Sequence, residues 1–550
     1  MTVGDEVVKR LSAEGVETIF GIPGKQTLPL NKAMNEFGIE FVMARHETAV
    51  SHNAWGYAES SGEVAGTVVI PGPGDMNAMN GLKNALNDCT PLIHIAVETE
   101  PEVRGGDGIH ETPPDTYDNV VKENYLVEEP QAAAPIVAEA VRTARTAPKG
   151  PVRVGIPKNF LTMDVPQAAP SDTTPPKPRQ PDVDAVDTAA SLLADADEPV
   201  IVIGGGVRAS GATDSLLALA ERLSSPVLTT YKGKGGFPED HPLSAGVLCG
   251  GTSPEVAEVL AESDVALAVG TDFDAVSTGQ WSLDVPEDLI HVTLDPNDIG
   301  TGYEPSVALV ADADTTLSML SDEVPQKEGT GAERARTARN SDENRIKELI
   351  DGDEPPLTSP TALRSVRSAI SEDTIVTADA GGFRLWTLVS FPAFGPRSYV
   401  NPGSWATMGT GLPSAIGAKT ANPDSDVVAL TGDGGLLMCV HELHTLAAEN
   451  IDVTVVVFAN QDYAIISEEA ERSYGLEDMT YGWPRASLSF DLIAEGMGIE
   501  VMNAETSTEI EETVAEAVES EGPTLVEVPT DPTEPQASEW MTRPQNQSSK

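Results

Sequence analysis

The sequence predicts an α/β protein made of three doubly wound domains, each built on a parallel sheet. Short runs of β-branched and aliphatic residues recur along the 550-residue chain, and many of them end in glycine-rich turns, as in GTVVIPGPG, PVIVIGGG and DVVALTGDGG. Continuous apolar runs of this length are typical of strands buried on both faces of a parallel sheet, and amphipathic helical stretches separate them. In such sheets, ligands bind at loops that follow the carboxyl ends of strands.

Two linkers divide the chain into three blocks. Residues 163–182 are too rich in proline for a helix or a central strand, and residues 324–360 combine a helical pattern with loop-forming ends. The chain length is also that of about three domains. We therefore expect domains over residues 1–162, 183–323 and 358–535.

The net charge indicates which binding partners the protein can have and how salty its surroundings are. The chain has 87 acidic and 34 basic residues, a formal net charge of -53, and its acids are dispersed. Such a surface repels nucleic acid and anionic lipid, so neither is expected as a partner. A disordered acidic tail or a surface for a basic partner would concentrate the acids. Their dispersion favours a protein adapted to a salt-rich cytosol, as in a halophile.

Three further features predict a cytoplasmic protein. No apolar run is long enough to cross a membrane. The first fifteen residues lack the apolar segment of a secretory signal. The three cysteines are widely spaced and form no CxxC pair, so neither a disulfide framework nor a zinc site is expected.

One glycine loop has the composition of a phosphate and metal site. A predicted strand is followed by Gly432, Asp433, Gly434 and Gly435, and the next predicted strand ends at Asn460. Glycines let the backbone approach a phosphate, and the helix that follows offers N–H groups to an anion. Asp433, Asn460 and the backbone carbonyl of Asp462 would offer oxygens to one hard cation, for which Mg²⁺ is the best match. Taken alone, the GDG sequence is equally compatible with an ordinary turn, and Asn460 with a cap.

The GDG loop followed by a strand-terminal asparagine resembles the fingerprint of thiamine diphosphate-dependent enzymes. The segments NPGSWATMGTGLPSAIGAKT and PTLVEVPTDP extend the resemblance, and its branch is that of acetolactate synthase and benzoylformate decarboxylase. The resemblance implies thiamine diphosphate and Mg²⁺ as cofactors, and pyrimidine-binding, central and diphosphate-binding domains in that order. It also implies a homodimer or a dimer of dimers with the cofactor between chains.

The resemblance assigns cofactor contacts residue by residue. FVMARHETAV resembles the segment whose glutamate, here Glu47, is the proton partner of the pyrimidine ring. A lone glutamate of this kind would otherwise be a surface helix residue. In WATMGTGLP, Met408 is the apolar side chain under the bent cofactor, although methionine is usually core filler, and Ala406 supplies a carbonyl. The other implied contacts are Gly381, Gly382, Gly432, Asp433, Gly434, Gly435, Asn460, Asp462 and Tyr463, of which Asp433, Asn460 and Asp462 hold the metal.

The substrate side is expected in two loops. FGIPGKQTLPL resembles the family's active-site loop, where Lys25 beside Gln26 would anchor a carboxylate or donate a proton. The alternative is that Lys25 turns outward to solvent. GGDGIHET resembles a second such loop, where His110 replaces a glutamine and could shuttle protons near neutral pH, or simply pack. Asn77 is a weaker candidate.

Departures from the family pattern affect which cofactors and which reaction we expect. Asp272 and Val276 replace both arginines of the flavin-binding segment of acetolactate synthases, so FAD is not expected. Phe383 and Arg384 replace polar residues after Gly382, and Arg384 could meet an anion. The leading function is a decarboxylase or carboligase acting on a small 2-oxo acid. The alternatives are an acetolactate synthase catalytic subunit for branched-chain amino acids, and a cofactor-binding or regulatory homologue without turnover.

Overall fold

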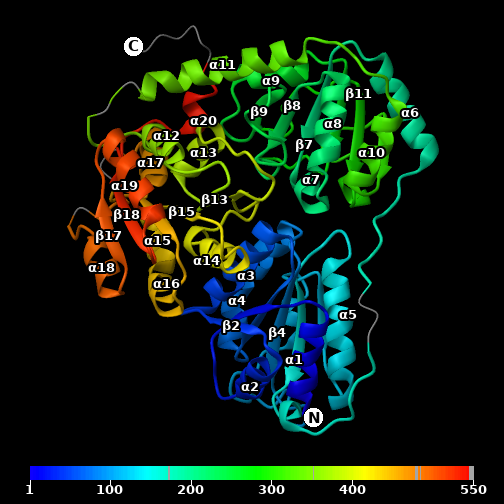
Figure 1. The fold of residues 1–550 in the computed structure, drawn as a ribbon, viewed down its shortest axis with the longest axis vertical. Coiled ribbons are helices and arrows are strands. Elements are labelled where there is room, and N and C mark those ends of the chain that lie inside the picture. The colour runs from blue at the N-terminus through cyan, green and yellow to red at the C-terminus, as the bar shows by residue number, and fades with distance from the viewer. Residues whose placement is uncertain (171–173, 351, 353, 477–480, 484, 544–550) are drawn as a thin grey trace.

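A computed structural model describes residues 1–170, 174–350, 352, 354–476, 481–483 and 485–543. Within them lie three sheets of six parallel strands each, one in each third of the chain (Figure 1). The prediction of a three-domain parallel α/β fold is confirmed. None of the helices in these ranges is both long and apolar enough to cross a membrane.

The N-terminal sheet has the order β2-β1-β3-β4-β6-β5. Its strands are β1 (Thr18–Gly21), β2 (Glu40–Met43), β3 (Ala65–Val69), β4 (Leu92–Glu98), β5 (Glu123–Leu126) and β6 (Val152–Pro157). Its helices are α1 (Val3–Ala13), α2 (Leu28–Phe37), α3 (Glu47–Ser61), α4 (Pro73–Asn87) and α5 (Ala133–Arg145). Helix α3 begins where the His46 ring accepts a hydrogen bond from the Thr48 amide, and it ends at Gly62 in the left-handed region.

The central sheet has the order β12-β11-β10-β7-β8-β9. Its strands are β7 (Pro199–Ile203), β8 (Val227–Thr230), β9 (Ser244–Leu248), β10 (Val265–Val269), β11 (Asp288–Thr293) and β12 (Val307–Val310). Its helices are α6 (Val183–Asp195), α7 (Gly205–Ser210), α8 (Thr213–Leu223), α9 (Pro254–Ala261) and α10 (Ala313–Glu323), and α11 (Gly331–Ile350) follows. Helix α11 buries Ala335 and Ala338 in the core of this domain, so the helical pattern in the second linker forms part of the fold.

The C-terminal sheet has the order β14-β13-β15-β16-β18-β17. Its strands are β13 (Ile375–Ala378), β14 (Tyr399–Val400), β15 (Val427–Gly432), β16 (Thr454–Ala459), β17 (Glu500–Asn503) and β18 (Thr524–Pro529). Its helices are α12 (Ser359–Ala369), α13 (Gly382–Ser390), α14 (Gly411–Ala421), α15 (Asp433–Cys439), α16 (Leu443–Glu449), α17 (Ala464–Tyr474), α18 (Phe490–Gly496), α19 (Ser507–Glu519) and α20 (Ala537–Trp540). Strands β15 and β16 are neighbours, so their carboxyl ends open on the same edge.

The first and third domains pack through α3 and α14 (Figure 1). A Cβ atom on Gly417 would lie 1.8 Å from the Asn53 carbonyl oxygen, and one on Gly56 would lie 2.2 Å from that of Ser414. Only glycine allows the two helix backbones to approach this closely. Aliphatic residues of both domains join one continuous core at this contact.

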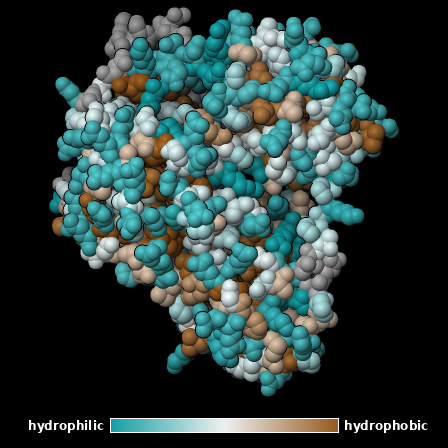
Figure 2. All heavy atoms as spheres, in the orientation of Figure 1, coloured by the Kyte–Doolittle hydropathy of each residue, from teal (hydrophilic) through white to brown (hydrophobic). Residues whose placement is uncertain are grey.

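The outer surface agrees with the acidic composition. Figure 2 shows hydrophilic side chains over most of one face, with hydrophobic residues in scattered patches. Several large apolar side chains are nevertheless exposed on the first and third domains, among them Leu28, Met76, Ile109, Met438 and Ile466. The exposed apolar residues lie on or near the loops where the sequence predicts the site.

Candidate active site

Asp433 joins the ends of the two neighbouring strands β15 and β16. Its side chain is buried, and one carboxylate oxygen accepts a hydrogen bond from the Gly434 amide at 2.7 Å. The other oxygen accepts from the amides of Asn460 at 3.0 Å and Gln461 at 2.6 Å. Burial raises the pKa of Asp433 to about 6 although these amides lower it. The structure therefore brings Asp433 and Asn460 together as the sequence predicts.

The segment after β16 adds further oxygens at the same edge. The Asn460 side-chain oxygen accepts from the Asp462 amide at 3.1 Å, and the Asp462 carboxylate accepts from the Ser467 hydroxyl at 2.9 Å. Within the described ranges, no group of three or more His, Cys, Asp or Glu side chains could hold a metal ion. A cation at this edge would be bound by one carboxylate together with amide and carbonyl oxygens. This set of oxygen donors fits Mg²⁺, which is commonly bound by one or two carboxylates and by phosphate oxygens of a ligand.

The glycines of this loop are required because other side chains pack directly against their backbone. A Cβ atom on Gly434 would lie 2.4 Å from the Tyr463 ring and 3.3 Å from the Met408 methyl group. One on Gly435 would lie 2.6 Å from a carboxylate oxygen of Asp379. Met408, Gly434 and Tyr463, which the sequence places in separate segments, thus surround one point at the start of α15. Only glycine fits at position 434 without displacing the Tyr463 ring.

Asp379 organises the loops of the site, a task that sequence reasoning missed. Its fully buried carboxylate accepts from the amides of Ala380 at 2.7 Å, Gly409 at 2.9 Å and Thr410 at 3.2 Å, and from the Thr431 hydroxyl at 3.0 Å. It ties the end of β13 to the loop that carries Ala406 and Met408, and to the end of β15. The detectable signal is an acidic residue directly after a buried strand.

The loop after β13 contains two glycines, followed by two large side chains at the start of α13. Gly381 has φ +145°, outside the range of most side chains, and Gly382 starts α13. The Phe383 ring packs beside Gly381, where a Cβ atom would lie 3.3 Å from it. Phe383 stacks on Phe458 with ring centroids 5.3 Å apart, and an Arg384 Nη donates to the Asn401 side-chain oxygen at 2.9 Å. Arg384 therefore points toward the domain junction.

Glu47 is the first residue of α3 and is half-buried. Its carboxylate accepts from the Asn77 side chain at 3.0 Å, and a Cβ atom on Gly74 would lie 3.1 Å from it. The preceding amides of Arg45 and His46 donate to the Glu442 carboxylate at 2.9 and 3.0 Å. Glu442, fully buried in the third domain, thereby fixes the start of α3, and this role also escaped sequence reasoning.

The loops of the substrate side gather around the same end of the first domain. Lys25 is exposed in the turn between β1 and α2, with Gln26 half-buried beside it. A Cβ atom on Gly24 in this turn would lie 2.3 Å from the Ile70 side chain, and Ile70 also borders Gly74. This places the Lys25 turn next to the loop that contacts Glu47.

His110 lies against that loop from the other side. Its backbone oxygen would be 2.6 Å from a Cβ atom on Gly72, and its own φ is +64°. The half-buried ring has an Nδ1 atom without a hydrogen-bond partner among the described residues. An unsatisfied polar atom at this place is suited to a ligand or a water molecule.

The segment that departs from the flavin pattern is acidic. Asp274 caps its own turn by accepting from the Val276 amide at 2.8 Å, and Val276 is exposed. Burial, and then the neighbouring Asp274, raise the pKa of Asp272. The loop thus carries two neighbouring carboxylates, and that of Asp274 is held by the amides of its own turn.

Comparisons with known proteins agree with this geometry. Three family models match: the N-terminal TPP binding domain of thiamine pyrophosphate enzymes over residues 1–119, their central domain over 186–320, and their C-terminal TPP binding domain over 379–528. A probable acetolactate synthase large subunit of Methanocaldococcus jannaschii is 31% identical, over 97% of this chain and 93% of the relative. A probable 2-ketoarginine decarboxylase of Pseudomonas aeruginosa is 32% identical, over 96% of this chain and 94% of the relative.

Solved structures share the fold over their whole length. A putative thiamin diphosphate-dependent enzyme from Mycobacterium smegmatis superposes with a TM-score of 0.82 at 25% identity, over 97% of this chain and 100% of that one. A benzoylformate decarboxylase from Polynucleobacter necessarius has a TM-score of 0.84 at 23% identity, over 97% and 99%. The chain belongs to the thiamine pyrophosphate enzyme family. The predicted class, a thiamine diphosphate-dependent decarboxylase or carboligase of 2-oxo acids, is confirmed.

Proposed function

We propose that the chain decarboxylates a 2-oxo acid at a site with two walls, the Asp433 loop and the Glu47 end of α3. The observation that carries the proposal is that Asp433 is joined to the end of β16 at the start of α15, where Met408 and Tyr463 meet Gly434. Asp433, Asn460 and the carbonyl of Asp462 hold Mg²⁺ against the diphosphate. Bound there, thiamine diphosphate would supply a carbon nucleophile and an electron sink for the decarboxylation of a 2-oxo acid.

The protein groups hold and move protons around the reacting carbon. Glu47 holds a proton on the pyrimidine ring, and its bond from Asn77 orients the carboxylate. Met408 would support the bound cofactor from one side, and the Ala406 carbonyl would accept a hydrogen bond from it. Lys25 and Gln26 bind the substrate carboxylate, while His110 exchanges a proton with the product.

We further propose that the two walls come from different subunits of a homodimer. Within one chain, Glu442 fixes the start of α3, and Glu442 follows α15 at the end opposite to Asp433. The axial rise between these two ends is roughly 15 Å. The exposed Met76 and Ile109 near one wall, and Met438 and Ile466 near the other, would be covered by such an isologous contact.

Subunit complementation tests the shared site. Glu47→Gln and Asp433→Ala proteins, each inactive alone, are mixed, dissociated and reassociated. Mixed dimers then contain one intact site, so part of the activity returns. If mixed dimers form without any activity, both groups act within one chain and the shared site is wrong.

Acetolactate synthase is the second candidate, favoured by the identity with the M. jannaschii relative over nearly the full length. Against it, Asp272 and Val276 remove two cations from the flavin segment, and we propose that FAD is not required. The deciding experiment is product analysis after incubation with pyruvate, thiamine diphosphate and Mg²⁺ at high salt. Acetolactate identifies a synthase and acetaldehyde a decarboxylase. The absence of turnover with pyruvate and with a panel of larger 2-oxo acids would contradict both.

A further inference from the structure

A cavity outside the proposed active site lies where the three domains meet. We name it the junction cavity. Its lining is Ala58, Glu59, Gly62, Asp88, Cys89, Thr90, Pro91, Lys149, Gly205, Arg208, Ala209, Lys232 and Arg397. Four of the 34 basic residues of the chain are gathered here, beside only two carboxylates. A cationic cluster of this kind is unexpected in a protein whose net charge is -53.

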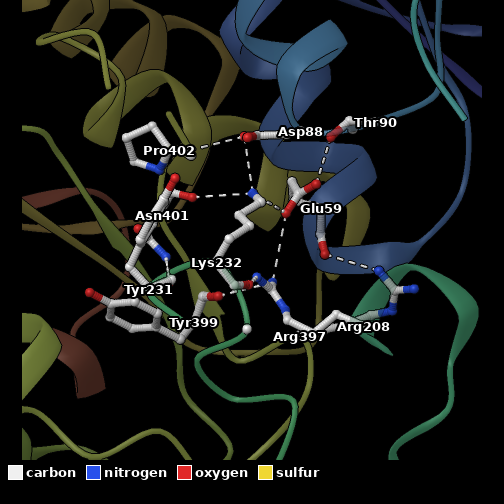
Figure 3. Close-up of polar contacts among 12 residues, drawn as sticks. Glu59, Asp88, Thr90, Arg208, Tyr231, Lys232, Arg397, Tyr399, Asn401 and Pro402 are labelled. Atoms are coloured by element: carbon white, nitrogen blue, oxygen red, sulfur yellow. Dashed lines mark hydrogen bonds and ion pairs between the residues drawn. The ribbon is translucent and has the colours of Figure 1, made fainter. Parts of the chain in front are cut away.

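The two carboxylates are occupied by Lys232. Figure 3 shows its ammonium group between Glu59 and Asp88, at 2.9 Å and 3.0 Å from their nearest oxygens. Glu59 also accepts from the Thr90 hydroxyl at 2.6 Å, and Asp88 from the Gly403 amide at 3.2 Å. Lys232 is therefore the cation that is paired most closely with both carboxylates of the cavity.

The other three cations come one from each domain, and they bond mainly to carbonyl oxygens. Lys149 of the first domain donates to the Ala209 carbonyl at 3.1 Å. Arg208 of the central domain donates to three carbonyls and lies 3.7 Å from the Glu59 carboxylate. Arg397 of the third domain donates to the Glu59 carbonyl at 3.0 Å. Carbonyls satisfy hydrogen bonds but neutralise no charge, so the four cations of the lining outnumber its two carboxylates.

Burial is the main cause that lowers the pKa values of two of these cations, and repulsion by a neighbouring cation adds to it. Burial, followed by the nearby Arg397, lowers the pKa of Lys149, and the carboxylates of Glu63, Asp312 and Glu59 offset part of this shift. Burial, followed by Arg208, lowers the pKa of Arg397. An anion between Lys149, Arg208 and Arg397 would reduce this repulsion. It would also attract one side chain from each domain.

The size of the cavity restricts the anion. Its volume of about 30 Å³ holds only one or two particles the size of a water molecule. The exposed Cys89 belongs to its lining, so an ion can enter from solvent. We propose that the junction cavity binds a single halide ion, chloride in the cell, which links the three domains electrostatically.

Bromide tests the site directly, because it resembles chloride and can be located by anomalous scattering. Crystals of the full-length protein are soaked in molar potassium bromide. The expected result is an anomalous peak among Lys149, Arg208 and Arg397. A cavity without a bromide peak would overturn the proposal, and this outcome does not depend on any variant.

A stability experiment tests the proposed link between domains. Melting temperatures are measured while bromide replaces acetate, a larger anion, at constant total potassium salt. Replacement of acetate by bromide should raise the melting temperature of wild type by about 2 °C or more beyond any rise in Lys149→Gln. The amide of this variant can still donate to Ala209. Lys177→Gln, an exposed substitution of equal charge, should behave as wild type. Equal bromide dependence in wild type and Lys149→Gln would refute the role of the ion.

Discussion

Removal of the Asp379 carboxylate should weaken both the third domain and its cofactor loop. In Asp379→Ala, the amides of Ala380, Gly409 and Thr410 lose their acceptor inside a buried site. The Thr431 hydroxyl keeps an alternative acceptor, the Gly432 carbonyl at 3.1 Å. Three orphaned donors would each cost about 1–3 kcal/mol, and water entering the vacated space recovers part of this. We therefore expect a loss of about 3–5 kcal/mol in the free energy of unfolding.

The assay combines stability with local dynamics. Urea unfolding at constant high salt gives the loss of stability, and hydrogen exchange of the peptide over residues 404–412 reports on the loop that carries Ala406 and Met408. Thiamine diphosphate affinity should fall at least tenfold because this loop loosens. Asp424→Ala is the control, since Asp424 is exposed in the same domain. A loss below about 1 kcal/mol with unchanged exchange would refute the organising role of Asp379.

Four further predictions concern the cofactor and the salt. Glu47→Gln should abolish turnover while calorimetry still detects cofactor binding, because an amide can accept from Asn77 but cannot hold the ring proton; turnover within tenfold of wild type would contradict the assignment. Asp433→Ala and Asn460→Ala should each lose Mg²⁺-dependent cofactor binding, and normal binding in either variant would make that residue a turn or a cap. Since burial raises the pKa of Asp433 to about 6 and only its ionised form ligates a cation, wild-type affinity should fall as the pH drops below about 6. Finally, the dispersed acids should make the protein lose structure in dilute buffer and recover it in molar potassium chloride; full stability at about 50 mM salt would contradict salt adaptation.

Local sequence determined the architecture and the position of the metal loop. A strand buried on both faces requires a continuous apolar run, so the runs that precede Gly432 and Asn460 identified two parallel strands without any knowledge of their neighbours. The glycines and acids that follow such strands are local as well, and they stand at the edge where parallel sheets bind ligands. The resemblance then assigned chemical roles to Glu47 and Met408.

Only the tertiary structure decided which distant groups support the site. Asp379 organises residues 409, 410 and 431, and Glu442 holds residues 45 and 46 of another domain. The junction cavity likewise needs one cation from each domain. A hydrogen bond or a charge cluster between distant segments leaves no periodic pattern in the chain, because each partner is an ordinary polar residue in its own segment. Such contacts exist only after the three sheets have packed, whereas the apolar runs that form the sheets are written consecutively in the sequence.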